Sequence, residues 1–123
     1  MRWTSTLFLL ALTFKGSLAL SSDEPHCKSN PKVVAACFNV RGRLNYWEGT
    51  PSTRIWIIGT HRVLGLPEED TDLPNSVKAH LHTFGDEITA DYVVCPLDKY
   101  RKGEMQMVCV QSASNVQFKH VKK

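Results

Sequence analysis

The chain has 123 residues, of which 15 are lysine or arginine and 12 are aspartate or glutamate, and its formal net charge is +3. This length corresponds to one domain of modest size, whose core is small relative to its surface. Arg2 and Lys15 lie in an N-terminal segment that we expect to be removed, and 13 basic residues then face 12 acidic ones, a net charge of +1. Nucleic-acid-binding domains have a strongly basic surface, so we expect no nucleic acid among the partners.

The first 19 residues have the pattern of an export signal. Arg2 provides a positive start, residues 7–14 form an apolar run, and Ser17-Leu18-Ala19 places small residues around a cleavage site. The run is shorter than the roughly 20 apolar residues that span a bilayer, and no second run of that length follows, so we expect no membrane span in the mature chain. The pattern predicts a secreted or periplasmic protein that folds in an oxidising compartment.

Three strands are expected in the first half of the mature chain. A polar leader, residues 20–36, comes first, and residues 37–46 then alternate between apolar and polar side chains, which is typical of a strand with one buried face. Residues 54–58 are β-branched or aromatic on both faces and predict a second strand. Residues 61–64 predict a short third strand, which Gly65 and a following proline end.

The second half of the chain predicts one helix and further strands. Val77, Leu81 and Phe84 share one face of a helix expected over residues 76–84. Alternating residues predict strands over 88–95 and 105–110.

The end of the chain adds an edge strand over residues 115–118, followed by a basic tail, residues 119–123. The pattern as a whole predicts a mainly β domain over residues 37–118, folded as a small antiparallel β-sandwich or open barrel with one short helix.

The four cysteines are expected to form two disulfides that staple this domain. A hairpin centred near Lys102 places Cys95 opposite Cys109, and opposed strand residues are close enough to bond. We therefore predict the pairs Cys95–Cys109 and Cys27–Cys37. No C-x-x-C motif is present, so we expect no metal site.

The candidate binding site is a cluster of arginines and aromatic residues. Alternation places Arg41 and Arg43 on the same face of one strand, and a hairpin would bring the next strand beside them. Arginine forks beside indole rings suit carboxylate, phosphate or sugar-acid ligands. The predicted binding residues are Arg41, Arg43, Arg54, Trp56 and Arg62.

A simpler explanation of this cluster, which we favour from the sequence, is structural. The acidic loop at residues 67–75 carries Glu68, Glu69, Asp70 and Asp72, which could pair with the arginines while the arginine stems cover the sheet.

No catalytic signature is present: the sequence contains neither G-x-S-x-G nor H-E-x-x-H, and its five histidines lack chelating spacing. We therefore expect no catalytic residue and no cofactor.

Two stretches carry a resemblance to a group of proteins. Residues 37–65, which include Gly49-Thr50-Pro51 and Gly59-Thr60-His61-Arg62, together with residues 94–110, are similar to small exported bacterial proteins of uncharacterised function. A strand, a Gly-x-Pro turn and a second strand also resemble, more distantly, the transthyretin-like or carboxypeptidase-regulatory β-sandwich. This second resemblance implies a binding or structural module.

Three functions are compatible with these observations. The leading hypothesis is a secreted or periplasmic, non-enzymatic binding or interaction module for an anionic ligand or a protein partner. The first alternative is a small hydrolase or lyase that acts on an anionic substrate through His61 and the arginines. The second is an exported inhibitor that presents the loop at residues 96–103.

Overall fold

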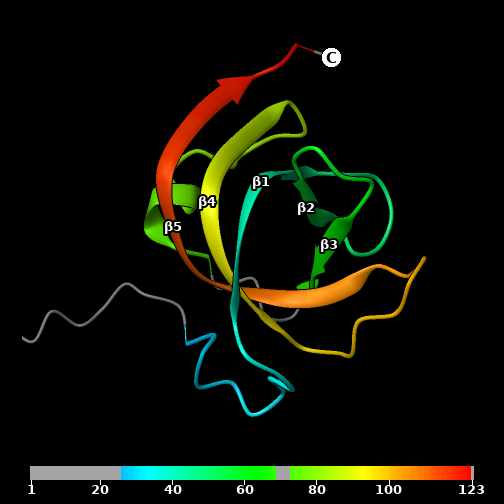
Figure 1. Cartoon of the computed structure of the whole chain (residues 1–123). Coiled ribbons are helices and arrows are strands. Elements are labelled where there is room, and N and C mark those ends of the chain that lie inside the picture. Colours follow the sequence, from blue (N-terminus) through cyan, green and yellow to red (C-terminus); the bar gives the residue numbers. More distant parts are fainter. Residues whose placement is uncertain (1–25, 69–72, 123) are drawn as a thin grey trace, which may run out of the picture.

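The computed structural model describes residues 26–68 and 73–122; the predicted export signal and Glu69, Asp70 and Asp72 lie outside the described residues. As predicted, the chain is mainly β with one short helix. The elements, in chain order, are β1 (Phe38–Tyr46), β2 (Thr53–Ile57), β3 (Val63–Leu66), α1 (Asn75–Lys78), β4 (Asp86–Pro96) and β5 (Gln106–His120) (Figure 1).

The five strands form one sheet that closes into a barrel in the order β1-β2-β3-β5-β4. Closure occurs because β1 pairs with β2 on one side and with β4 on the other, so that Gly42 lies opposite both Ile57 and Ala90. All pairings are antiparallel except that of β3 with β5, which is parallel, whereas the sequence predicted only antiparallel strands. This strand order, with a helix between β3 and β4, is the topology of the OB-fold, a five-stranded Greek-key barrel.

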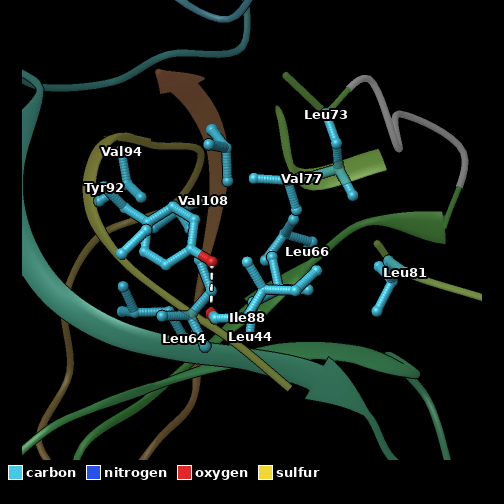
Figure 2. Packing of buried hydrophobic residues seen from close by; sticks show 13 residues of the cluster. Leu44, Leu64, Leu66, Leu73, Val77, Leu81, Ile88, Tyr92, Val94 and Val108 are labelled. Carbon is cyan, nitrogen blue, oxygen red and sulfur yellow. Dashed lines mark hydrogen bonds between the residues drawn. The ribbon is translucent and has the colours of Figure 1, made fainter. Parts of the chain in front are cut away.

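The interior of the barrel is filled by the apolar side chains of alternate strand positions (Figure 2). Leu44 is fully buried beside its cross-strand partners Ile55 and Ile88, which are also fully buried. The Tyr92 hydroxyl donates a hydrogen bond of 2.6 Å to the carbonyl oxygen of Ile88, and burial raises the pKa of this phenol. Gly42 faces the same interior. A Cβ atom at this position would collide with the side chain of Ile55 on the paired strand β2, so only glycine fits here.

The helix is shorter than predicted: it spans Asn75–Lys78 rather than residues 76–84. Asp86 explains the difference, because its Oδ2 accepts hydrogen bonds of 2.8 Å from the backbone N–H groups of His82 and Thr83. These bonds fix a turn where the helix was expected to continue, and they leave Phe84 54% exposed instead of buried.

Asp86 also connects the turn at His82 and Thr83 to the end of β5. Its side chain is buried, and its Oδ1 lies 2.7 Å from Nδ1 of His120 at the end of β5. The hydrogen bond from His120, followed by those from the backbone of His82 and Thr83, lowers the pKa of Asp86 to about 2.

The last two predicted strands, at 105–110 and 115–118, are one long strand, β5, which curves around the barrel (Figure 1). The pairing of β5 with β4 shifts register between Thr89 and Asp91 and again between Val93 and Val94. Asn115 lies opposite the first shift with a positive φ of 50°. These irregularities let one strand continue where the sequence suggested a break.

The two disulfides are present, but the predicted pairing is wrong. The strand register does place Cys95 opposite Cys109. Cys95 nevertheless bonds to Cys37, with a Cα–Cα distance of 4.0 Å, and Cys109 bonds to Cys27, with a Cα–Cα distance of 5.5 Å. The reason is that β4 has a neighbour on each side, and continuing the β1–β4 register beyond Phe38 and Val94 puts Cys37 opposite Cys95 as well. The leader is therefore tied to β5 rather than to β1.

Candidate functional site

The outer surface of β1 and β2 brings together two of the predicted arginines, the predicted Trp56 and a second tryptophan, Trp47. Arg43 pairs across the strands with Trp56, and the next outward position pairs Asn45 with Arg54. Diagonal neighbours on one face of such a ladder lie about 7–8 Å apart, so Arg43 and Arg54 belong to one patch. We call Arg43, Trp47, Arg54 and Trp56 the arginine–tryptophan face.

Each tryptophan of this face is fixed by its indole N–H and lies near a guanidinium group. Nε1 of Trp56 donates to the carbonyl oxygen of Thr60 at 2.8 Å, and the guanidinium carbon of Arg43 is 5.3 Å from the Trp56 ring centroid. Nε1 of Trp47 donates to Oδ1 of Asn45 at 2.8 Å, which holds the ring over the end of the strand pair. The guanidinium carbon of Arg54 is 5.6 Å from the Trp47 centroid.

The two arginines of the face differ in how they are neutralised. Nε of Arg43 lies 3.7 Å from a carboxylate oxygen of Glu87 on β4, and both side chains are partly exposed, so this is a weak ion pair. Nε of Arg54 donates to the carbonyl oxygen of Pro51 at 2.8 Å. Among residues 26–68 and 73–122, no carboxylate pairs with Arg54.

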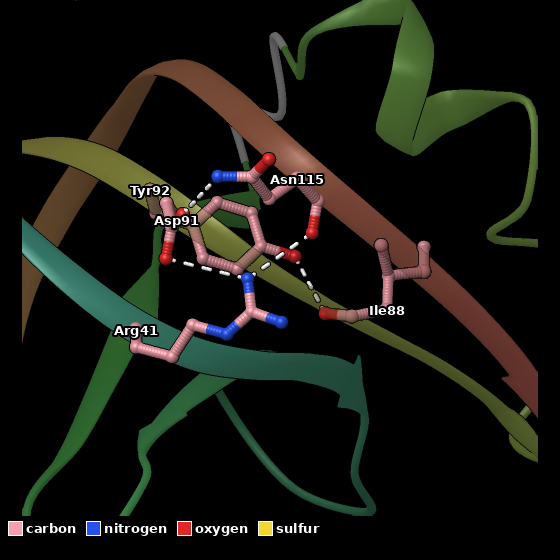
Figure 3. Close-up of polar contacts among 5 residues, drawn as sticks. All are labelled: Arg41, Ile88, Asp91, Tyr92 and Asn115. Atoms are coloured by element: carbon pink, nitrogen blue, oxygen red, sulfur yellow. Dashed lines mark hydrogen bonds and ion pairs between the residues drawn. The ribbon is translucent and has the colours of Figure 1, made fainter.

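Arg41 lies on the same strand but is held by the framework (Figure 3). Its Nη1 donates to Oδ1 of Asp91 at 3.3 Å and to the carbonyl oxygen of Asn115 at 3.1 Å. Nδ2 of Asn115 donates to the other carboxylate oxygen of Asp91 at 2.6 Å. The bonds from Asn115 and then from Arg41 lower the pKa of Asp91, and the three side chains together bridge β1, β4 and β5.

Arg62 is separated from the face because it precedes β3, in the turn at the end of the barrel. Its guanidinium carbon lies 5.5 Å from the Phe38 ring centroid and 4.4 Å from that of Tyr100. Its Nη2 donates to Oε1 of Gln106. The five predicted residues therefore divide into Arg43, Arg54 and Trp56 on one face, Arg41 in a structural ion pair, and Arg62 at the barrel end.

The described acids that pair with the predicted arginines belong to β4, whereas Glu69, Asp70 and Asp72 of the acidic loop lie outside the described residues. Arg41 and Arg43 pair with Asp91 and Glu87, which belong to β4. Glu68, the described member of the acidic loop, instead accepts a hydrogen bond of 3.1 Å from the backbone N–H of Ser52.

The geometry around His61 bears on the catalytic alternative. His61 is exposed, and it lines a hollow of about 540 Å³ with Arg62, Tyr100 and Glu104. Glu104 is also exposed and pairs with Arg101 at 3.7 Å. In the described parts of the chain the only buried carboxylate is Asp86, which lies toward the other end of the barrel, where it is held by His120.

The one group of potential metal ligands found in residues 26–68 and 73–122 consists of Cys27, Cys95 and Cys109. All three sulfur atoms are bonded in disulfides, which removes the thiolates that a metal would need. The disulfides are consistent with an oxidising, exported location.

No family model, no curated protein and no solved structure matches the chain. Across the described residues, none of the helical segments is long and apolar enough to cross a membrane. The function must therefore be argued from the chemistry of the site, since a fold alone does not determine it.

Sequence reasoning did not identify the surroundings of Arg62. The rings of Phe38 and Tyr100 lie against this guanidinium, and neither residue is among the predicted binding residues. A weak signal is present in the sequence, because Tyr100 is an aromatic residue among Lys99, Arg101 and Lys102.

Proposed function

We propose that the protein is a secreted or periplasmic binding module that holds an anionic ligand on the arginine–tryptophan face and catalyses no reaction itself. The observation that carries the proposal is Arg54, whose guanidinium lies near the Trp47 ring and has no carboxylate partner among the described residues. A guanidinium group beside an aromatic ring suits a ligand that combines negative charge with a flat apolar surface.

The ligand class that fits best is an acidic oligosaccharide. The apolar face of a sugar ring stacks on an indole, and Trp47 is 42% exposed while its N–H remains bonded to Asn45. A uronic-acid carboxylate can then accept paired hydrogen bonds from Arg54 or displace Glu87 from Arg43. Because the ion pair between Arg43 and Glu87 is weak, at 3.7 Å, breaking it costs little free energy.

The position of the face on the barrel supports the same conclusion. In OB-folds, oligosaccharides and oligonucleotides bind over strands 2 and 3, flanked by the loops that join strands 1 to 2 and 4 to 5. Trp56 and Arg54 lie on β2, and Trp47 lies in the loop between β1 and β2. The near-neutral charge of the mature chain favours an acidic sugar over a nucleic acid, whose binding draws on many phosphate contacts.

Isothermal titration calorimetry with defined sugars tests the proposal. The probes are hexagalacturonate and a heparin hexasaccharide, with the neutral cellohexaose as the uncharged comparison. We expect at least one acidic sugar to bind and the neutral sugar to bind more weakly. Binding of none of the three would contradict the proposal.

A charge-matched pair of variants locates the binding site. The double variant Arg43→Gln, Arg54→Gln removes two charges from the face and should weaken acidic-sugar binding at least about tenfold, as expected for lost charge-assisted hydrogen bonds. The control Lys28→Gln, Lys122→Gln removes two charges from exposed side chains of the leader and the C-terminal tail and should bind like the unmodified protein. Equal loss in both variants would show that only net charge matters.

A further inference from the structure

Arg62 lies at the end of the barrel and has no counter-ion among residues 26–68 and 73–122. The rings of Phe38 and Tyr100 lie against its guanidinium at 5.5 Å and 4.4 Å, and Gln106 accepts a hydrogen bond from Nη2. Nε of Arg62 is buried and has no hydrogen-bond partner, and no carboxylate pairs with Arg62 within the described residues. A buried donor of a charged group that lacks an acceptor is costly, so such groups usually have a partner.

An apolar hollow of about 660 Å³ adjoins this guanidinium. Its walls include Val34 and Ala36 of the leader, Phe38 and Pro96, and Tyr100 of the loop between β4 and β5. Val34 is 60% exposed and Tyr100 is 52% exposed, which leaves apolar surface open at the hollow. The volume lies within the range of about 300–1,000 Å³ that is typical of sites for small molecules.

A disulfide and a backbone hydrogen bond hold the leader wall of the hollow in place. The disulfide between Cys27 and Cys109 fastens the leader, and the backbone N–H of Val34 donates to the carbonyl oxygen of Pro96 at 3.0 Å. Gln106, which orients Arg62, in turn donates from Nε2 to the carbonyl oxygen of Asp98 at 3.1 Å.

The charges at the hollow favour an anion. Arg62 and Lys99 are the cations, and the one carboxylate is Asp98, whose Oδ1 is occupied by the backbone N–H of Met107 at 3.0 Å. The neighbouring hollow of about 540 Å³ shares Arg62 and Tyr100 and also includes one carboxylate, Glu104, but it lacks the second cation, Lys99. The larger hollow is therefore the better anion site.

We propose that this hollow is a second ligand site, which binds a small carboxylic acid with an apolar body and pairs its carboxylate with the guanidinium of Arg62. The apolar body packs against the leader and Phe38, and the carboxylate lies against the guanidinium group. A singly charged carboxylate fits better than a phosphate, because a doubly charged group loses more hydration in an apolar hollow that offers one arginine fork. This site is distinct from the arginine–tryptophan face and does not depend on the function proposed for it.

Calorimetric titration with 2-naphthoate tests this site, with the uncharged 2-naphthamide as the matched comparison. We expect the acid to bind at least about tenfold more tightly than the amide, since only the acid satisfies the guanidinium. Octanoate serves as an aliphatic probe and should compete with 2-naphthoate. Equal affinity for the acid and the amide, or no binding of either, would overturn the proposal.

Three variants show whether Arg62 is the anchor. Arg62→Gln should abolish the preference for the acid, and Arg62→Lys, which keeps the charge but loses the fork, should retain only part of it. The Arg43→Gln, Arg54→Gln variant should bind 2-naphthoate normally, which separates this site from the sugar-binding face. Thermal unfolding checks that each variant is folded.

An NMR measurement on the unmodified protein tests the site even if Arg62→Gln fails to fold. In the unmodified protein the Nε–Hε resonance of Arg62, assigned through the Arg62→Lys variant, should move downfield when 2-naphthoate is added. Binding of 2-naphthoate without any change in this resonance would show that the acid lies elsewhere.

Discussion

Leu44→Ala is the substitution that tests the barrel core most simply. Leu44 has no exposed surface and lies between Ile55 and Ile88 on the two neighbouring strands. The change removes three carbon atoms, and at about 0.8 kcal/mol for each buried methylene the transfer cost alone is about 2.4 kcal/mol. The cavity that remains raises the expected loss to about 2–5 kcal/mol.

Urea unfolding of the oxidised protein, followed by tryptophan fluorescence, measures this loss. Val34→Ala is the control, because Val34 is 60% exposed and an ordinary surface change costs less than about 0.5 kcal/mol. A loss below about 0.5 kcal/mol for Leu44→Ala would refute the inward orientation of Leu44 and, with it, the register of β1.

Two further predictions concern the disulfides and acid stability. Peptide mapping without reduction should recover Cys37 joined to Cys95, and a fragment joining Cys95 to Cys109 would contradict the structure. Because the pKa of Asp86 falls from 3.8 to about 2 on folding, its contribution to stability is present above pH 3.8 and should be lost as the pH falls toward 2. Asp86→Asn, which replaces the carboxylate that His120 contacts, should flatten this part of the stability curve measured by urea unfolding. If the variant loses stability between pH 3.8 and 2 as the unmodified protein does, other groups control the acid sensitivity.

The alternation of apolar and polar residues predicted the fold class correctly. A strand with one buried face places an apolar side chain at every second position, and this pattern is visible in the sequence. The strand predicted at residues 37–46 agrees closely with β1; of its polar positions, Asn39, Arg41 and Arg43 are at least partly exposed, whereas Asn45 is buried and bonded to the indole N–H of Trp47. The same reasoning failed for β5, where polar residues follow Val110 and interrupt the pattern. The strand continues there because a register shift and the positive φ of Asn115 accommodate them, and neither feature leaves a period in the sequence.

The closure of the sheet could not be read from local patterns. The parallel contact between β3 and β5 joins residues about 40 positions apart, such as Leu64 and Gln106. The disulfide error has the same origin: the hairpin register of Cys95 and Cys109 was predicted correctly, but the second neighbour of β4 was not known.

The candidate site was predicted in part for similar reasons. Alternation placed Arg43 on an outward position, and the expected hairpin, which the pairing of β1 with β2 confirms, brings Arg54 and Trp56 beside it. Arg62 lies in a turn, where strand alternation cannot predict the direction of a side chain. Its neighbours come from the start of β1 and from the loop after β4. Asp91 became a partner of Arg41 only through the closure of β4 onto β1.

Indole resonances report directly whether the arginine–tryptophan face binds an acidic sugar. Nε1 of Trp47 and of Trp56 are bonded to fixed oxygen atoms, so each indole N–H gives a separate signal, which the variants Trp47→Phe and Trp56→Phe assign. Titration with whichever acidic hexasaccharide binds should move both signals together, with the same saturation curve as the calorimetry. Saturation of the calorimetric signal while both indole resonances stay in place would contradict the account.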